Sequence, residues 1–293
     1  MKRFIFKAAG FLVLGFLILN FFGYLLIHSD GLSKLLSWGP VLAVVEKSKR
    51  AMPPGSTVLI LGDSVGNQFF PAHMFPVSLA ANGSVLAAGH YILAHNAIKR
   101  NKQLKYVVLL SVPFVIGHQF ARSRTYNNFM KPFYRFENLR YISDQLQEKI
   151  NKRIMARLVL FPFVKTAPCF SDIDFSTGTE KPAYILSDTA IEYLKKLQTL
   201  CRNNGIDLIV VSPPIQERWG KITKNWEKMK AQIVQNGLDD IFKTYFNRII
   251  YLDNNNFMDH VHLQWDYLNK NRAALISRML PKEVLDSLFR PKN

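Results

Sequence analysis

Short apolar runs recur along the chain with segments of helix length between them, and this alternation is the feature that most constrains its fold. The clearest run, residues 57–62 with the sequence TVLILG, contains no charge. Continuous apolar runs are typical of strands buried on both faces of a parallel sheet, whose crossovers are usually helices. Further strands are expected at residues 77–81, 106–112, 207–212 and 248–252. The alternation therefore predicts an α/β fold around a mostly parallel, five-stranded sheet.

Apolar spacing and end signals predict the helices between these strands. They are expected at residues 86–102, 188–202, 222–236 and 266–279. Ser187 is the expected N-cap of the second helix, and Gly205 closely follows its end. Residues 114–185 interrupt the alternation with many aromatic and basic residues and one expected helix at 138–159. We interpret this segment either as an insertion over the functional edge of the sheet or as an ordinary structural lobe.

Residues 8–27 form a run of twenty residues without charge, which is long enough to cross the hydrocarbon of a bilayer as a helix. Lys2, Arg3 and Lys7 precede the run, so the positive-inside rule keeps the N-terminus in the cytoplasm. A cleaved signal peptide is the alternative, but it would have a shorter apolar core. The expected organisation is a cytoplasmic tip and transmembrane anchor at 1–30, a juxtamembrane helix and linker at 31–56, and an extracytoplasmic domain at 57–293.

The net charge of +17 would indicate a nucleic-acid binder in a cytosolic protein. Export across the inner membrane excludes that partner, so we expect no nucleic acid. An anionic membrane surface or an acidic glycan suits the spread of basic residues, and a generally basic solvated surface explains it equally well.

Cysteine usage gives little support to metal or redox chemistry. Cys169 and Cys201 are the two cysteines, and they either pair in an oxidising compartment or remain free. Neither lies in a CxxC motif or beside other metal-ligating residues. We expect no metal and no cofactor.

Gly62 ends the first apolar run, and Asp63 and Ser64 directly follow it. Asp259 and His262 lie after the last run. Side chains at the carboxyl ends of parallel strands gather at one edge of an α/β sheet, where ligands bind. A serine hydroxyl needs an imidazole to remove its proton, and the imidazole needs an acid to orient it. We therefore predict that Ser64, His262 and Asp259 form a catalytic triad.

The three-residue spacing of Asp259 and His262 places their Cβ atoms about 5–6 Å apart in a helix-like turn. His260 points elsewhere under the same geometry. Asp63 is expected to cap the turn before Ser64 rather than to carry a proton. The remaining histidines have no similarly placed acid and are interpreted as surface or core residues: His73, His90, His95 and His118.

These two blocks resemble the motifs of the SGNH (GDSL-type) hydrolase superfamily, and the resemblance covers residues 57–280. It implies a flavodoxin-like three-layer α/β/α sandwich that acts on esters through an acyl-enzyme. It also implies an oxyanion hole formed by the Ser64 N–H, by a glycine N–H that Gly83 matches, and by an asparagine in a Gly-x-Asn-Asp block.

That last block is absent, because residues 111–114 read Ser-Val-Pro-Phe. Losing one oxyanion donor costs about 2.7–4 kcal/mol of transition-state stabilisation. Asn82, Ser111 and Asn67 are the candidate substitutes. Because it lacks this block and has an expected N-terminal anchor, the chain resembles membrane-anchored acyl-transfer and O-acetylation proteins of the cell envelope.

Two functions follow as expectations. The first is a membrane-anchored extracytoplasmic serine esterase or O-acyltransferase acting on acyl esters of a cell-envelope polysaccharide. The second is a non-catalytic accessory protein that assists a membrane-bound acyltransferase or a glycan-export complex. The expected partners are the membrane and an acylated glycan.

Overall fold

The computed structural model describes residues 2–28, 39–81, 83, 85–117, 128–129, 131–148, 185–220 and 224–289. The chain divides into two compact units, one made of residues 1–38 and 121–173 and the other of residues 39–120 and 174–293. The second unit contains the sheet and the predicted triad.

A parallel four-stranded sheet with the strand order β2-β1-β3-β4 forms the centre of the second unit. Its strands are β1 (Val58–Gly62), β2 (Ser78–Ala80), β3 (Tyr106–Leu110) and β4 (Asp207–Val211). All five residues of β1 are buried, as expected for a strand covered on both faces. The predicted α/β class and the mostly parallel sheet are confirmed.

The predicted fifth strand does not join this sheet. The segment forms β6 (Tyr251–Leu252), which pairs in parallel with β5 (Ile215–Gln216) in a separate two-stranded sheet. Ser212 separates β4 from Pro213 and Pro214, and because proline has no N–H the ladder of β4 cannot continue through these two residues. The prediction of one five-stranded sheet was therefore wrong.

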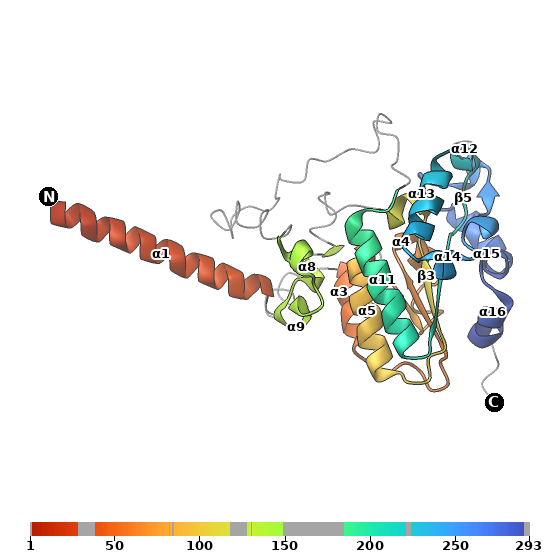
Figure 1. Ribbon diagram of the computed structural model, residues 1–293, viewed down its shortest axis with the longest axis horizontal. Helices are drawn as coiled ribbons and strands as arrows, with labels where there is room; N and C mark the ends of the chain where they lie inside the picture. The colour runs from red at the N-terminus through yellow and green to blue at the C-terminus, as the bar shows by residue number, and fades with distance from the viewer. Residues whose placement is uncertain are drawn as a thin grey trace. The chain divides into compact units, whose positions relative to one another are not determined.

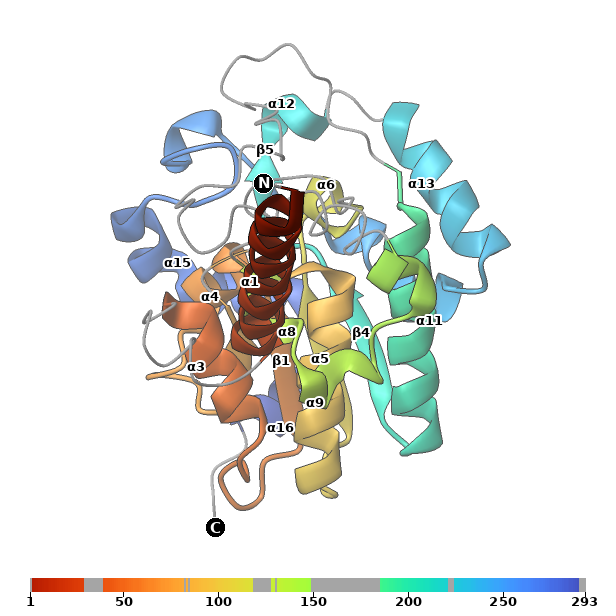
Figure 2. The ribbon, with the colours of Figure 1, turned by 90° about the vertical axis from the view of Figure 1, so that its left-hand side faces the viewer.

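Helices pack on both faces of the four-stranded sheet. On one face α3 (Gly39–Ser48), α5 (Leu86–Arg100) and α11 (Asp188–Asn203) lie in that order (Figure 2). On the other face lie α15 (Trp265–Met279) and α16 (Lys282–Phe289), whose side chains Leu268, Ile276 and Val284 share a buried cluster with Ile60 and Val108 (Figure 1). Val65 and Phe69, which lie on the helix that begins at Ser64, belong to the same buried cluster.

The predicted helix positions agree with α5, α11, α13 (Lys224–Gln235) and α15 to within a few residues. The Ser187 side chain caps α11 by accepting a hydrogen bond from the Ala190 N–H at 3.2 Å. The helix α16 was not predicted. Of the helix expected at 138–159, the described part contains α9 (Phe136–Leu139) and a helical turn at 144–148, and residues 149–159 lie outside the described residues.

The N-terminal segment forms α1 (Lys2–His28). Within the described residues, none of the helices combines the length and the apolar character that crossing a membrane requires. The transmembrane helix predicted from residues 8–27 is therefore not confirmed.

The helix α3, expected in a juxtamembrane linker, packs against α5 and β2. Its Val44 and Val45 are buried, and Lys47 Nζ donates to the carbonyl of Ser78 at 2.8 Å. The Ser78 hydroxyl accepts from the Ala80 N–H, so polar side chains occupy two backbone groups of this edge strand. The compact unit that contains the sheet begins at Gly39.

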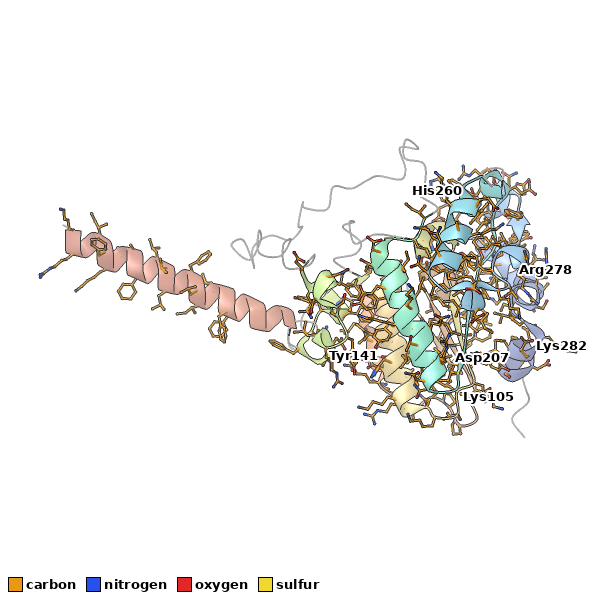
Figure 3. The ribbon with its side chains drawn as sticks, in the orientation of Figure 1. Lys105, Tyr141, Asp207, His260, Arg278 and Lys282 are labelled. Atoms are coloured by element: carbon orange, nitrogen blue, oxygen red, sulfur yellow. The ribbon has the colours of Figure 1, made fainter. Side chains whose placement is uncertain are left out.

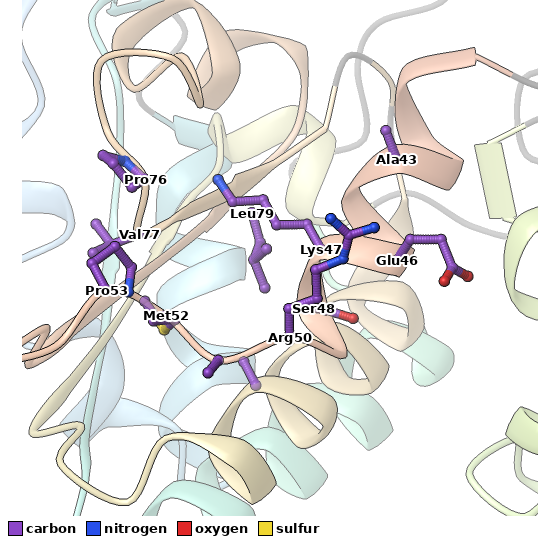
Figure 4. A pocket seen from close by; sticks show the side chains of 12 residues that line it. Ala43, Glu46, Lys47, Ser48, Arg50, Met52, Pro53, Pro76, Val77 and Leu79 are labelled. Carbon is purple, nitrogen blue, oxygen red and sulfur yellow. The ribbon is translucent and has the colours of Figure 1, made fainter.

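A cavity of about 460 Å³ lies between α3, the segment 50–53 and the segment 76–79 (Figure 4). Apolar side chains line most of it, together with Lys47 near the end of α3 and Arg50 just after that helix. Burial lowers the pKa of Lys47. The lining contains no member of the predicted triad, so this cavity is separate from the site described below.

Candidate active site

A short helix, α4 (Ser64–Phe69), begins immediately after β1 and carries Ser64 at its first position. A Cβ atom on Gly62 would lie 3.0 Å from the Cα of Gly66 and 3.2 Å from the carbonyl oxygen of Leu110. A side chain at position 62 would therefore push α4 away from the sheet. Glycine here lets the helix start directly above the end of β1, which places Ser64 at the carboxyl edge of the sheet.

Asp63 caps this helix, as predicted. Its Oδ1 accepts from the N–H groups of Val65 at 2.9 Å and Gly66 at 3.4 Å. The side chain is buried, and burial raises the pKa of Asp63 even though these two hydrogen bonds and the nearby His262 act in the opposite direction. Its contacts fix the start of α4 and so the position of Ser64.

The structure brings the three predicted triad residues together. His262 Nε2 lies 2.9 Å from Ser64 Oγ, and His262 Nδ1 lies 2.7 Å from Asp259 Oδ2. A carboxylate only accepts hydrogen bonds, so Nδ1 carries the proton donated to Asp259. Nε2 is then left to accept from the Ser64 hydroxyl, which is the arrangement that a general base requires.

The Asp259 carboxylate also organises its own loop. Its Oδ1 accepts from the N–H groups of Val261 and His262, both at 2.8 Å. Burial raises the pKa of Asp259, but the two backbone hydrogen bonds and the hydrogen bond from the His262 ring outweigh it and lower the pKa overall. The carboxylate therefore stays ionised at neutral pH and holds the tautomer of His262.

Gln68 ties the helix of Ser64 to the loop of His262. It lies four residues after Ser64 on α4 and is buried. Its Nε2 donates to the carbonyl of Leu263 at 2.6 Å, and its Oε1 accepts from the Leu263 N–H at 3.1 Å. Since Leu263 follows His262 directly, this pair of hydrogen bonds sets the distance between base and hydroxyl.

Two further residues secure the loop and the helix. Arg272 on α15 donates from Nη1 to the carbonyls of Gln68 at 2.6 Å and Phe69 at 3.0 Å, at the end of α4. Gln216 on β5 donates from Nε2 to the carbonyl of Asp259 at 2.7 Å. Gln68, Arg272 and Gln216 were not identified from the sequence, and the one available signal was that Gln68 lies one helical turn after Ser64.

The expected oxyanion donors are only partly in place. The Ser64 N–H, at the first position of α4, has no hydrogen-bond partner within the described part of the chain. The Gly83 N–H, by contrast, donates to the carbonyl of Ala81 at 2.8 Å. Asn82 lies outside the described residues. An oxyanion hole that used Gly83 would need this short turn to rearrange.

The side chain of His260 does not take part in the triad, as expected. Its Nδ1 lies 2.7 Å from Arg218 Nη2. His90, expected in the core or on the surface, is buried in α5, and burial lowers its pKa to about 3. It is therefore neutral at physiological pH.

Within the described ranges no cluster of three or more His, Cys, Asp or Glu residues could hold a metal ion. Cys201 is a buried free thiol whose pKa burial raises to about 12, with a smaller effect from Asp207. Cys169 lies outside the described residues, so the question of their pairing falls there too.

Comparisons of the chain with protein-family models, with curated proteins and with solved structures find no match.

Proposed function

We propose that this protein is a serine-dependent esterase or O-acyltransferase of the SGNH type. One observation carries the proposal: Ser64 Oγ lies 2.9 Å from His262 Nε2, whose other ring nitrogen is bonded to Asp259. The first four strands of a flavodoxin-like sheet have the order 2-1-3-4, which is also the order found here. This order supports the flavodoxin-like sandwich that the motifs imply.

In the proposed reaction Ser64 Oγ attacks the acyl carbonyl while its proton passes to His262 Nε2. Asp259 stabilises the resulting imidazolium through Nδ1, and the Ser64 N–H faces the developing oxyanion. His262 then returns the proton to the leaving alkoxide oxygen, and the ester bond breaks to leave an acyl-Ser64 intermediate. Water completes a hydrolysis, and a sugar hydroxyl completes a transfer. In both cases His262 removes the proton of the attacking group and returns it to Ser64 Oγ as the bond between Oγ and the acyl group breaks.

The proposed substrate is an acyl ester of a cell-envelope polysaccharide, and the proposed location is the outer side of the cytoplasmic membrane. The uncharged run at 8–27, preceded by Lys2, Arg3 and Lys7, supports a single-pass anchor with a cytoplasmic N-terminus. The net charge of +17 favours an anionic polymer or membrane surface near the domain.

Fluorophosphonate labelling of the purified full-length protein tests the chemistry. We expect wild type to be labelled and Ser64→Ala to lose the label, because the reagent reacts with an activated serine. Ser48→Ala, which changes a buried serine on α3 whose hydroxyl donates to the carbonyl of Val45, is the matched control and should be labelled like wild type. Equal labelling of wild type and Ser64→Ala would contradict the proposal.

The second candidate is a non-catalytic accessory protein that assists a membrane-bound acyltransferase. The bond from the Gly83 N–H to Ala81 and the missing Gly-x-Asn-Asp block favour it, since both weaken the oxyanion hole. Complementation of a deletion strain separates the two functions. Rescue by both Ser64→Ala and His262→Ala would support the accessory role, whereas failure of both would support catalysis.

A further inference from the structure

Three side chains form a cluster beside the triad loop. Arg218 lies on α12 (Glu217–Gly220), which directly follows β5. Its Nη2 lies 2.7 Å from His260 Nδ1, and its guanidinium carbon lies 5.2 Å from the centroid of the Trp219 ring. The rings of Trp219 and His260 meet edge to face, with centroids 6.3 Å apart. A guanidinium only donates, so His260 Nδ1 accepts, and Arg218 is held from two sides.

The cluster lies close to the proposed reaction centre. His260 follows Asp259, and Gln216, two residues before Arg218, binds the Asp259 carbonyl at 2.7 Å. Figure 3 shows His260 at the end of the sheet opposite Lys105 and Asp207, which lie where β3 and β4 begin. The guanidinium therefore lies at the carboxyl edge of the sheet, bonded to the loop that carries His262.

Arg218 is exposed, and within the described residues it forms no ion pair. Other cations of the described residues pair with a glutamate on the same helix, as Lys196 does with Glu192 on α11 and Lys230 with Glu227 on α13. The bond to His260 uses one of the five N–H groups of the guanidinium. The remaining N–H groups of the guanidinium can donate in parallel pairs to the oxygens of a carboxylate or a phosphate.

We propose that Arg218, positioned by His260 and Trp219, is a subsite for an oxyanion of the substrate, so that the glycan bears a carboxylate or phosphate group near its acyl ester. This inference deepens the proposed function and rests on it. Because the guanidinium is already held in place, little side-chain entropy is lost when the anion binds.

Binding to the full-length Ser64→Ala protein, which cannot turn over an ester by the proposed reaction, tests the subsite by calorimetry. The probes are tetragalacturonate, which carries carboxylates, an oligomer of glycerol phosphate, which carries phosphodiesters, and maltotetraose, which is neutral. We expect at least one anionic probe to bind and Arg218→Gln to weaken that binding about tenfold or more, the effect of one charge-assisted hydrogen-bond pair. The anionic probe that binds more tightly identifies the source of the oxyanion.

Arg278→Gln is the matched control, because it removes the same charge from an exposed position on α15 (Figure 3). It should change the affinity less than about twofold, as expected for screened charges at a distance. The inference is overturned if neither anionic probe binds, if both variants weaken binding equally, or if maltotetraose binds as tightly as the anions. The calorimetry measures binding and not catalysis. If Ser64 is not labelled by the fluorophosphonate, the proposed catalysis is contradicted, but the binding experiment still decides whether Arg218 is an anion subsite.

Discussion

At the scale of single residues, the site depends on two carboxyl groups in different environments. Asp63 is buried beneath Ser64, and burial raises its pKa. Asp259 makes more hydrogen bonds in a more exposed position, and its pKa is lowered. The same side-chain type thus serves as a structural cap in one place and as an ionised partner of His262 in the other, and the environment decides which.

Replacing Asp63 with asparagine tests the cap without removing it, because the amide oxygen still accepts from the Val65 N–H. Folding raises the pKa of Asp63 above its ordinary 3.8, so its contribution to stability is complete below that pH. The contribution is lost as the pH rises through the folded-state pKa. We expect Asp63→Asn to gain free energy of unfolding relative to wild type as the pH rises, by at most about 1.4 kcal/mol per pH unit.

Urea denaturation of both proteins at several values between about pH 4 and pH 7 measures this gain. A difference that stays constant over the range, or that falls as the pH rises, would show that Asp63 does not titrate as its burial implies.

At the scale of elements, two segments that are distant in the chain are joined by a few buried polar contacts. The helix α4 and the loop of His262 meet through Gln68 and Leu263, while Arg272 attaches α15 to the end of α4. These contacts join backbone groups to side chains, so they fix where the elements lie without depending on the chemistry of the triad. Gln68 is therefore a positioning residue.

Gln68→Leu removes both hydrogen bonds to Leu263 and should lower kcat for p-nitrophenyl acetate about 100-fold, because a shift near 1 Å in a reacting group has such an effect. KM should change little, since no substrate contact is removed. The variant should also lose about 1–3 kcal/mol of stability for each unsatisfied backbone group. Steady-state kinetics below the unfolding temperature measure the effect.

Asn101→Leu provides the matched control. Asn101 is also a buried amide with two backbone partners, the N–H of Met52 and the carbonyl of Ala97, both at 2.7 Å, and neither partner belongs to the triad loop. It should lose comparable stability and keep wild-type kcat. If the two variants lose kcat equally, Gln68 acts on stability alone.

At the scale of the whole molecule, different helices cover the two faces of the sheet. The layer that contains α5 and α11 includes a group that is sensitive to acid. The face that carries α5 and α11 buries His90, whose Nδ1 has no hydrogen-bond partner among the described residues. A neutral imidazole in this layer makes the whole fold sensitive to acid, because protonating it places a charge among apolar side chains.

The His90 pKa of about 3 lies below its ordinary value of 6.5, so its contribution to stability is present above pH 6.5 and is lost as the pH falls toward 3. The loss amounts to at most about 1.4 kcal/mol per pH unit. We expect His90→Leu to flatten the acid limb of the stability curve, measured by thermal or urea unfolding from about pH 7 to pH 4.

His73→Leu, at an exposed position, is the control and should keep the wild-type slope. An acid limb as steep in His90→Leu as in wild type would show that His90 does not limit the stability of the fold in acid.

The sequence by itself determined most of the elements and the three residues that meet at the candidate site. Apolar runs located β1, β3 and β4, Ser187 and Gly205 marked the ends of α11, and the spacing of Asp259 and His262 predicted their pairing. These features are local: strand burial, helix caps and a three-residue spacing are written in neighbouring residues.

Tertiary structure alone decided how these elements combine. It showed that β6 pairs with β5 instead of extending the main sheet, that α3 packs against α5 and β2, and that the Gly83 N–H is bonded to Ala81. It also showed that Gln68 links α4 to the loop 195 residues further along the chain. Such pairings depend on which of many distant partners comes within hydrogen-bond range in the folded chain, and local spacing carries no information about that choice.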